Sequence, residues 1–289
     1  MVIAVASGKG GTGKTTVSVS LAEYLAAYEK IPVLVSDADV EAPNAHLFLK
    51  PGFSETKQVE QQVPRVREDI CSGCGTCAEV CQFNAIVLLK DKPRVFPSLC
   101  HGCGSCTRQC PEGAIEEVPR EIGKLERGYC ADELLVRQGL LAEGEPMAVP
   151  VISDLKRWGN NFESKVEIID SPPGASCPVV EAIRGSDYVL LVTEPTPFGL
   201  HDLKQALQVT RELGLPAGVI LNRAGLGEED IQGFCKKEGI PMLMEIPLDR
   251  KIGEGLARGE SLLEIDPAYR SAFSDLWTDI QNEIKVVGL

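Results

Sequence analysis

Eight of the eleven cysteines in this 289-residue chain lie within one stretch of forty residues. They form two runs with the same spacing, Cys-x2-Cys-x2-Cys-x3-Cys, and the second run repeats the first at an offset of 29 positions. Eight of the sixteen positions are identical when 71–86 are aligned with 100–115, which indicates an internal duplication. The two runs are Cys71, Cys74, Cys77 and Cys81, and Cys100, Cys103, Cys106 and Cys110.

This spacing is typical of iron–sulfur ligands. Three thiolates on one tight loop can hold three irons of a cubane, while the fourth cysteine of each run reaches the other cluster. The duplication resembles bacterial ferredoxins, whose fold has pseudo-twofold symmetry. We therefore predict two [4Fe–4S] clusters. The first would be held by Cys71, Cys74, Cys77 and Cys110, and the second by Cys100, Cys103, Cys106 and Cys81.

Disulfides and zinc are the alternatives for these cysteines. The chain begins Met-Val-Ile-Ala-Val-Ala-Ser, without the basic start of an export signal, so we expect a reducing cytoplasm in which disulfides are rare. Zinc favours paired Cys-x2-Cys knuckles over a run of this kind. The spacing therefore favours iron–sulfur clusters.

A second motif predicts a phosphate-binding loop. Residues 2–7 form an apolar strand, and apolar residues at helical spacing follow over 14–29. A glycine-rich loop between strand and helix presents N–H groups to phosphates, with Lys14 beside the β- and γ-phosphates and the Thr15 hydroxyl on Mg²⁺. The loop residues expected to bind ATP are Gly8, Lys9, Gly10, Gly11, Thr12, Gly13, Lys14, Thr15 and Thr16.

The lysine directly after the first glycine marks a deviant form of this loop. With it the chain resembles the MinD/ParA-like ATPases, which include the nitrogenase iron protein. The resemblance implies that Lys9 reaches the partner's nucleotide across an ATP-dependent homodimer. The alternative is that Lys9 is a solvated surface side chain.

Two aspartate motifs extend this resemblance. Asp37 and Asp39 follow the strand 32–37, as in switch I of the family, where the second aspartate orients or deprotonates the attacking water and the first supports the metal site. Asp170 ends the strand 166–170 before Pro-Pro-Gly, as in switch II, and is expected to hold Mg²⁺. The catalytic residues implied are therefore Lys14, Asp39 and Lys9. Ordinary loop-capping aspartates are the alternative for Asp37 and Asp39.

The resemblance also implies a base-binding wall near the C-terminal strands. Asn222 ends one predicted strand and would contact the adenine edge, while Pro247 and Asp249 would flank the ring. Arg223 is assigned to the same pocket. These residue types are also common in turns.

Strands and helices alternate along the chain, which predicts an α/β P-loop NTPase with a mainly parallel sheet flanked by helices. The ATPase domain is predicted over 1–59 and 119–289, and an inserted α+β ferredoxin domain with two [4Fe–4S] clusters over 60–118. The expected strands are 2–7, 32–37, 147–152, 166–170, 187–193, 217–222 and 241–246. The expected helices are 14–29, 199–213, 229–238, 250–258 and 268–285.

Cys177 lies seven residues after Asp170, the same offset as a cluster-ligating cysteine in the nitrogenase iron protein. It could contribute to a third cluster that bridges two subunits. The alternative, for Cys177 as for Cys130 and Cys235, is a small buried apolar side chain.

These features predict an ATPase that couples dimer closure to delivery of electrons or of a metal cluster to a partner protein. The alternative is a redox-sensing ATPase for spatial positioning, like MinD or ParA. The net charge of −13 disfavours a nucleic-acid partner, and the acidic C-terminal segment disfavours a membrane anchor. The chain resembles the subgroup of MinD-like ATPases with an inserted two-cluster ferredoxin. Members of this subgroup are often labelled cobyrinic acid a,c-diamide synthase-like, but we find no residues for amide transfer.

Overall fold

A computed structural model describes residues 1–130, 134–159 and 163–287. Its main feature is a nine-stranded sheet in the order β11-β10-β9-β1-β8-β2-β7-β6-β3. Neighbours from β11 to β7 pair in parallel, whereas β6 and β3 are antiparallel at one edge. The parallel strands are β1 (Val2–Ala6), β2 (Val33–Asp37), β7 (Leu134–Leu141), β8 (Val166–Asp170), β9 (Tyr188–Thr193), β10 (Ala217–Ala224) and β11 (Met242–Pro247).

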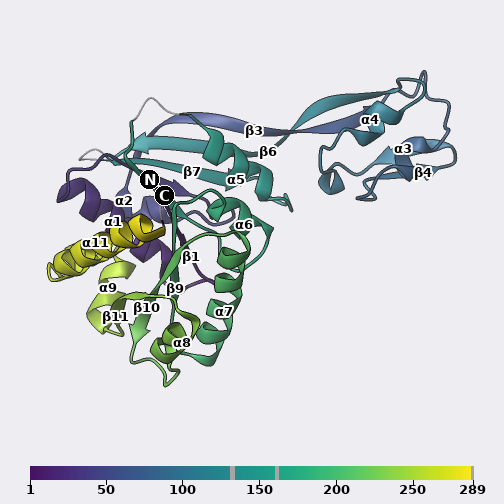
Figure 1. The fold of residues 1–289 in the computed structure, drawn as a ribbon. Helices are drawn as coiled ribbons and strands as arrows, with labels where there is room; N and C mark the ends of the chain where they lie inside the picture. The colour runs from purple at the N-terminus through teal and green to yellow at the C-terminus, as the bar shows by residue number, and fades with distance from the viewer. Residues whose placement is uncertain (131–133, 160–162, 288–289) are drawn as a thin grey trace.

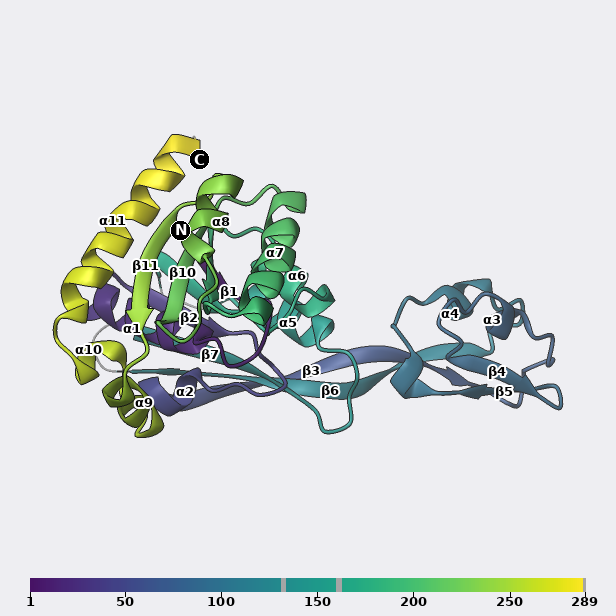
Figure 2. The same ribbon diagram turned by 90° about the horizontal axis from the view of Figure 1, so that it is seen from below.

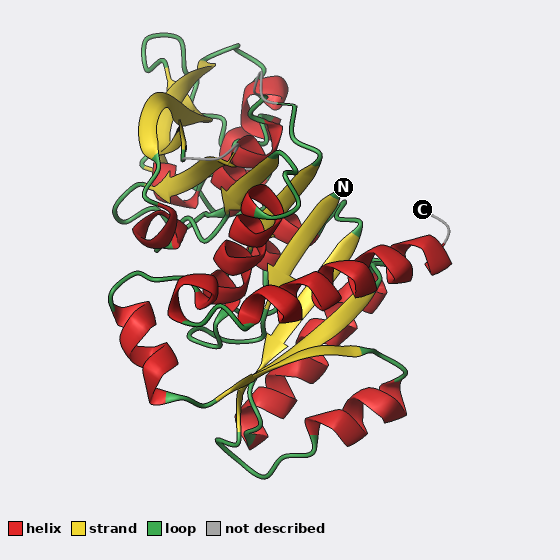
Figure 3. Cartoon of the chain, turned by 90° about the vertical axis from the view of Figure 1, so that its left-hand side faces the viewer, coloured by secondary structure: helices red, strands yellow, loops and turns green. Residues whose placement is uncertain are grey.

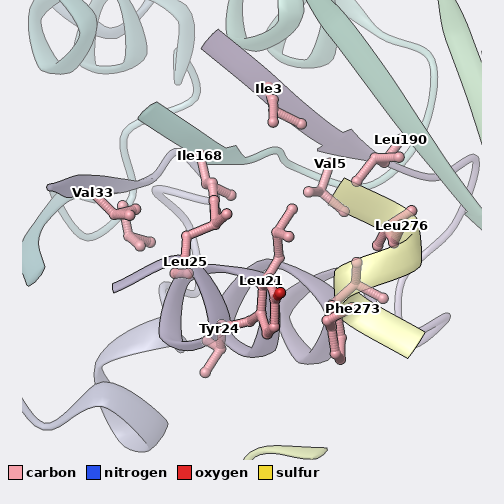
Figure 4. Packing of buried hydrophobic residues seen from close by; sticks show 14 of the residues in the cluster. Ile3, Val5, Leu21, Tyr24, Leu25, Val33, Ile168, Leu190, Phe273 and Leu276 are labelled. Atoms are coloured by element: carbon pink, nitrogen blue, oxygen red, sulfur yellow. The ribbon is translucent and has the colours of Figure 1, made fainter. Parts of the chain in front are cut away.

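Helices cover both faces of this sheet because successive strand residues point to opposite sides (Figure 3). On one face, Ile3 and Val5 pack against Leu21 and Leu25 and against Phe273 (Figure 4). The helices of this face are α1 (Lys14–Ala27), α2 (Ala45–Leu49), α9 (Arg250–Ala257), α10 (Leu262–Ile265) and α11 (Tyr269–Val287).

The opposite face has a second core, to which β1 contributes Ala4 and Ala6. Its helices are α5 (Val149–Arg157), α6 (Cys177–Ile183), α7 (Pro197–Glu212) and α8 (Ile231–Glu238). The parallel strands are thus buried on both sides, which explains their nearly continuous apolar sequences.

Two long strands leave the sheet as a hairpin. β3 (Gly52–Val66) and β6 (Ile115–Tyr129) pair along their lengths and carry residues 67–114 away from the helices and the parallel strands (Figures 1 and 2). We call 67–114 the distal segment and the rest of the described chain the body. The distal segment contains α3 (Thr76–Glu79), β4 (Ile86–Leu89), β5 (Lys92–Val95), the short 3-10 helix η1 (Pro97–Leu99) and α4 (Ser105–Gln109). The domain boundaries predicted at 60 and 118 fall within β3 and β6.

The predicted α/β class with a mainly parallel sheet is confirmed, and eleven of the twelve predicted elements match to within two residues. The strand predicted over 147–152 is wrong, since helix α5 begins at Val149. Pro150 fits the first turn of a helix, and Val151, Ile152 and Leu155 bury one helical face. A short apolar run cannot by itself distinguish a buried strand from the start of a helix. The sequence analysis missed β7, β3 and β6.

None of the helices in the described ranges is both long and apolar enough to cross a membrane.

Candidate functional site

The loop after β1 is held where α1 begins. Gly13 has φ of 100° directly before Lys14, and a Cβ there would lie 2.3 Å from Nδ2 of Asn222. Asn222, near the end of β10, donates from Nδ2 to the carbonyl of Thr12 at 2.7 Å. The loop is therefore fixed at the N-terminus of a helix, where free N–H groups and the helix dipole favour a phosphate.

A cavity of about 330 Å³ opens on this loop. Its walls bring together residues from the two ends of the chain, as the sequence analysis predicted. Phe48, Leu248 and Ile252 add apolar surface on which a flat ring can pack, and Asn44 adds an amide. The sequence analysis did not assign these four. The predicted residues that line the cavity are Gly10, Gly11, Gly13, Lys14, Thr15, Thr16, Asp39, Asn222, Arg223, Pro247 and Asp249. Gly8, Lys9 and Thr12 lie outside its lining.

Two buried carboxylates lie at the ends of adjacent strands. Asp37 of β2 and Asp170 of β8 are paired in the sheet register, and their side chains are inaccessible or nearly so. Asp170 accepts from the hydroxyl of Thr15 at 2.6 Å and from that of Ser18 at 3.0 Å. Asp37 accepts from the backbone N–H groups of Asp39, Asn44 and Ala45. These donors fix the two carboxylates beside the phosphate loop.

Burial is the main cause that raises the pKa of each carboxyl in this pair. Asp170 further raises the pKa of Asp37, whereas Thr15 lowers that of Asp170. Burial also lowers the pKa of Lys14, and the nearby aspartates oppose this. Two buried carboxylates at the ends of adjacent strands form a suitable environment for a divalent cation with oxygen ligands. Ser18 was not found from the sequence, although it lies on the same helical face as Thr15.

Asp39 extends from switch I into the cavity, where it is half-buried. Burial raises the pKa of its carboxyl, and Lys14 lowers it. Asp39 is therefore accessible from the cavity, whereas Asp37 is held by backbone donors. The different roles that the resemblance implies for them stay a prediction.

Lys9 forms an ion pair with Glu194, just past the end of β9. The Glu194 side chain is 6% exposed and also binds Arg223 at 2.9 Å. Lys9 therefore has a partner within its own chain. Its side chain is 33% exposed, less than that of a freely solvated lysine. Glu194 lies outside the cavity lining, and the sequence analysis did not assign it. Its position after a buried strand and before Pro195 was the available signal.

The distal segment gathers the eight clustered cysteines into two cavities. One is lined by Cys71, Cys74, Cys77 and Cys110, and the other by Cys81, Cys100, Cys103 and Cys106. Each cavity therefore combines three cysteines of one run with the fourth cysteine of the other. These are the two sets that the sequence predicts.

Backbone groups approach the sulfurs in a repeated manner. The N–H of Ala85 lies 3.3 Å from Sγ of Cys81, and the N–H of Ala114 lies 3.3 Å from Sγ of Cys110. No disulfide joins any of the eleven cysteines in the described residues. Within the described ranges, no three His, Cys, Asp or Glu side chains are grouped closely enough to hold a metal ion. Ligation of clusters by the two sets stays a prediction.

Residues 3–263 match the family model described as the CobQ/CobB/MinD/ParA nucleotide binding domain. The chain belongs to this family. The cavity on the phosphate loop lies within the matched residues, and binding of a nucleotide by its lining stays a prediction.

The sequence relatives of this chain include proteins of two kinds. An uncharacterised protein of Methanocaldococcus jannaschii is 33% identical over 266 residues, which cover 91% of this chain and 92% of that protein. The iron–sulfur cluster carrier protein of Rickettsia typhi is 28% identical over 255 residues, which cover 86% of this chain and 61% of the carrier.

Among solved structures, the septum site-determining protein MinD of Pyrococcus horikoshii, complexed with Mg-ADP, has a TM-score of 0.60 at 20% identity. The match covers 99% of this chain and 97% of that one. At this identity the likeness shows a shared fold.

The remaining cysteines lie in three different environments. Cys235 is on α8 and is buried in the core, as expected of a small apolar side chain. Cys130 is half-buried beside Glu23. Cys177 is exposed at the first residue of α6, so the interpretation of it as a buried apolar side chain is wrong for the single chain. Its role in a third cluster stays a prediction.

Proposed function

We propose that this CobQ/CobB/MinD/ParA protein hydrolyses ATP and couples closure of a homodimer to transfer of electrons, or of a metal cluster, to a partner protein. The observation that carries this proposal is the arrangement of the distal segment. The hairpin that begins shortly after switch I ends in two cavities, each lined by a crossed set of four cysteines. The similarity to an iron–sulfur cluster carrier supports the same conclusion.

For hydrolysis, Lys14 would neutralise charge on the β- and γ-phosphates while the loop N–H groups bind their oxygens. Asp39, which faces the cavity, would orient the water that attacks the γ-phosphate in line with the leaving oxygen. Thr15, Asp37 and Asp170 would hold Mg²⁺, either directly or through water. The cation supplies positive charge as the phosphoryl group is transferred.

For the redox part, the two crossed cysteine sets would each hold one [4Fe–4S] cluster. Gly73, Gly75, Gly102 and Gly104 all have positive φ, which lets the loops turn tightly around the cavities. The N–H groups of Ala85 and Ala114 point at sulfurs, as expected of donors that stabilise thiolate ligands. When bound, such clusters supply one-electron transfer.

Strand β7 connects the loop after β2 to the base of the hairpin. Val40, one residue after Asp39, accepts from the N–H of Leu141 at 2.8 Å, at the end of β7. β7 pairs with β2 on one side and with β6 of the hairpin on the other. A displacement of switch I would therefore be transmitted to the base of the hairpin. We propose that Lys9 leaves Glu194 and contacts the partner's nucleotide when two chains close on ATP.

The test uses anaerobically purified protein and matched variants. Eight irons per chain are expected, with Lys14→Ala losing ATP hydrolysis but retaining its iron. Cys110→Ser should disturb the cluster of the first set, and Cys81→Ser that of the second. Cys235→Ser is the control, because Cys235 lies in the body core. Protein that binds no iron, or Lys14→Ala that hydrolyses ATP at the wild-type rate, would refute the proposal.

A second experiment separates coupling from sensing. Reduced protein is mixed with ATP and candidate acceptor proteins, and cluster oxidation or iron transfer is followed by absorbance. Oxidation or transfer that requires hydrolysis supports the proposal. Unchanged cluster spectra, together with an ATPase rate that depends on the redox state, would favour a redox-sensing positioning ATPase instead.

A further inference from the structure

One arginine lies on the hairpin, between the distal segment and the core of the body. Arg120 of β6 is directly opposite Gln61 of β3 in the hairpin. Two residues before it, Val118 packs with Cys100 in a small apolar cluster of the distal segment. Two residues after it, Ile122 belongs to the core of the body. Alternate strand residues share a face, so Arg120 lies on the face that joins these two groups.

The surroundings of Arg120 connect it to the second cysteine set. Gln61 donates from Nε2 to the carbonyl of Cys100 at 2.9 Å, and its side chain also limits the space beside Gly102. Arg120 itself donates from Nη1 to Glu145 at 2.6 Å. The Glu145 side chain is 2% exposed and belongs to the loop between β7 and α5.

The Arg120 side chain is 26% exposed, and two of its nitrogens are buried without a hydrogen-bond partner in the described residues. Nε and Nη2 of Arg120 are inaccessible and make no hydrogen bond within the described parts of the chain. Arg120 is outside the lining of the second cavity, and its cross-strand neighbour Gln61 bonds the carbonyl of Cys100. The arginine therefore lies one residue away from the second cysteine set without contacting its cavity.

We propose that Arg120 raises the reduction potential of the cluster held by Cys81, Cys100, Cys103 and Cys106, and that Glu145 limits this effect. The inference rests on the proposed function, because it requires a cluster at this set. Reduction adds one negative charge to a cluster, and a nearby buried cation stabilises that charge. The carboxylate of Glu145 neutralises part of the cation's field. Arg120 thus acts on electron transfer through its charge, and it makes the reduction potentials of the two clusters unequal.

The test is an anaerobic redox titration of the full chain followed by EPR, with each cluster assigned from the paramagnetically shifted NMR signals of its cysteines. Arg120→Gln is expected to lower the equilibrium constant for reduction of the second cluster about tenfold. This corresponds to a fall of about 59 mV in its reduction potential for a one-electron couple. Glu145→Gln retains the arginine and should shift the same cluster in the opposite direction. The first cluster should titrate as in the wild type in both variants.

Arg65→Gln is the matched control. Arg65 lies on the same hairpin and is also paired with a glutamate, Glu116, but its side chain is 65% exposed, so neither cluster should shift. Equal shifts of both clusters, or no shift in either variant while iron content is retained, would overturn the inference. Wild-type protein without clusters would instead refute the proposed function, so the two failures are distinguishable. If Arg120→Gln does not fold, Glu145→Gln decides the question.

Discussion

Replacing Glu23 by glutamine tests how the body tolerates a half-buried carboxylate. Glu23 lies on α1 and lines a cavity of about 380 Å³ together with Cys130 and Glu264. Burial raises the pKa of Glu23 from 4.5 to about 7. A hydrogen bond with Ser261 opposes this rise, Glu264 adds to it, and Lys50 opposes it. The charged form is therefore less favourable in the folded chain than in the unfolded chain.

The expected magnitude follows from this difference in pKa. Between pH 4.5 and about 7 the folded chain holds a proton on Glu23 that the unfolded chain releases. The free energy of unfolding therefore falls as the pH rises through this interval. The full difference corresponds to about 3 kcal/mol. Glu23→Gln has no charge to bury, so above about pH 7 it should be more stable than the wild type by up to this amount.

The assay is urea unfolding followed by tryptophan fluorescence, since Trp277 packs in the same core as α1. The wild type and Glu23→Gln are compared at several pH values from about 5 to 8. Glu228→Gln, which changes an exposed glutamate, is the control and should follow the wild-type profile. A constant difference between Glu23→Gln and the wild type across this interval would show that Glu23 does not titrate there, and would refute the reasoning.

Three further predictions concern single side chains. Asp170→Asn removes the carboxylate that accepts from Thr15, and calorimetry should show ADP affinity reduced about tenfold to a hundredfold in the presence of Mg²⁺, with a smaller change in its absence. Gly13→Ala places a Cβ against Asn222 at φ of 100°, so ADP binding should be lost and the Tm lowered, whereas Gly159→Ala, where a Cβ meets open space outside the cavity, should retain both. The Tyr188 hydroxyl is buried without a hydrogen-bond partner in the described residues, so Tyr188→Phe should raise the free energy of unfolding by about 1 kcal/mol in urea titrations. A less stable Tyr188→Phe variant would indicate that the hydroxyl has a partner such as a buried water.

Local signals in the sequence predicted the candidate site residues of this chain. The phosphate loop and the strand-terminal aspartates were recognisable because a strand, a glycine-rich turn and a helix follow one another directly. The cysteine spacing predicted two crossed sets of four, and the two cavities of the distal segment have those linings. Such features depend on neighbouring residues, so they can be predicted before any tertiary contact is known.

Long-range packing decided the rest. β3 and β6 are separated by the distal segment, and their pairing follows from a register that no local pattern specifies. Residues 149–157 became a helix because Val151, Ile152 and Leu155 could bury one face against the sheet. Glu194 reaches Lys9, and Arg120 reaches Glu145, only after distant strands have come together. Spacing along the chain thus determined which residues can do chemistry, while the tertiary structure decided which charges act on them, because electrostatic interactions depend on distance and burial in space.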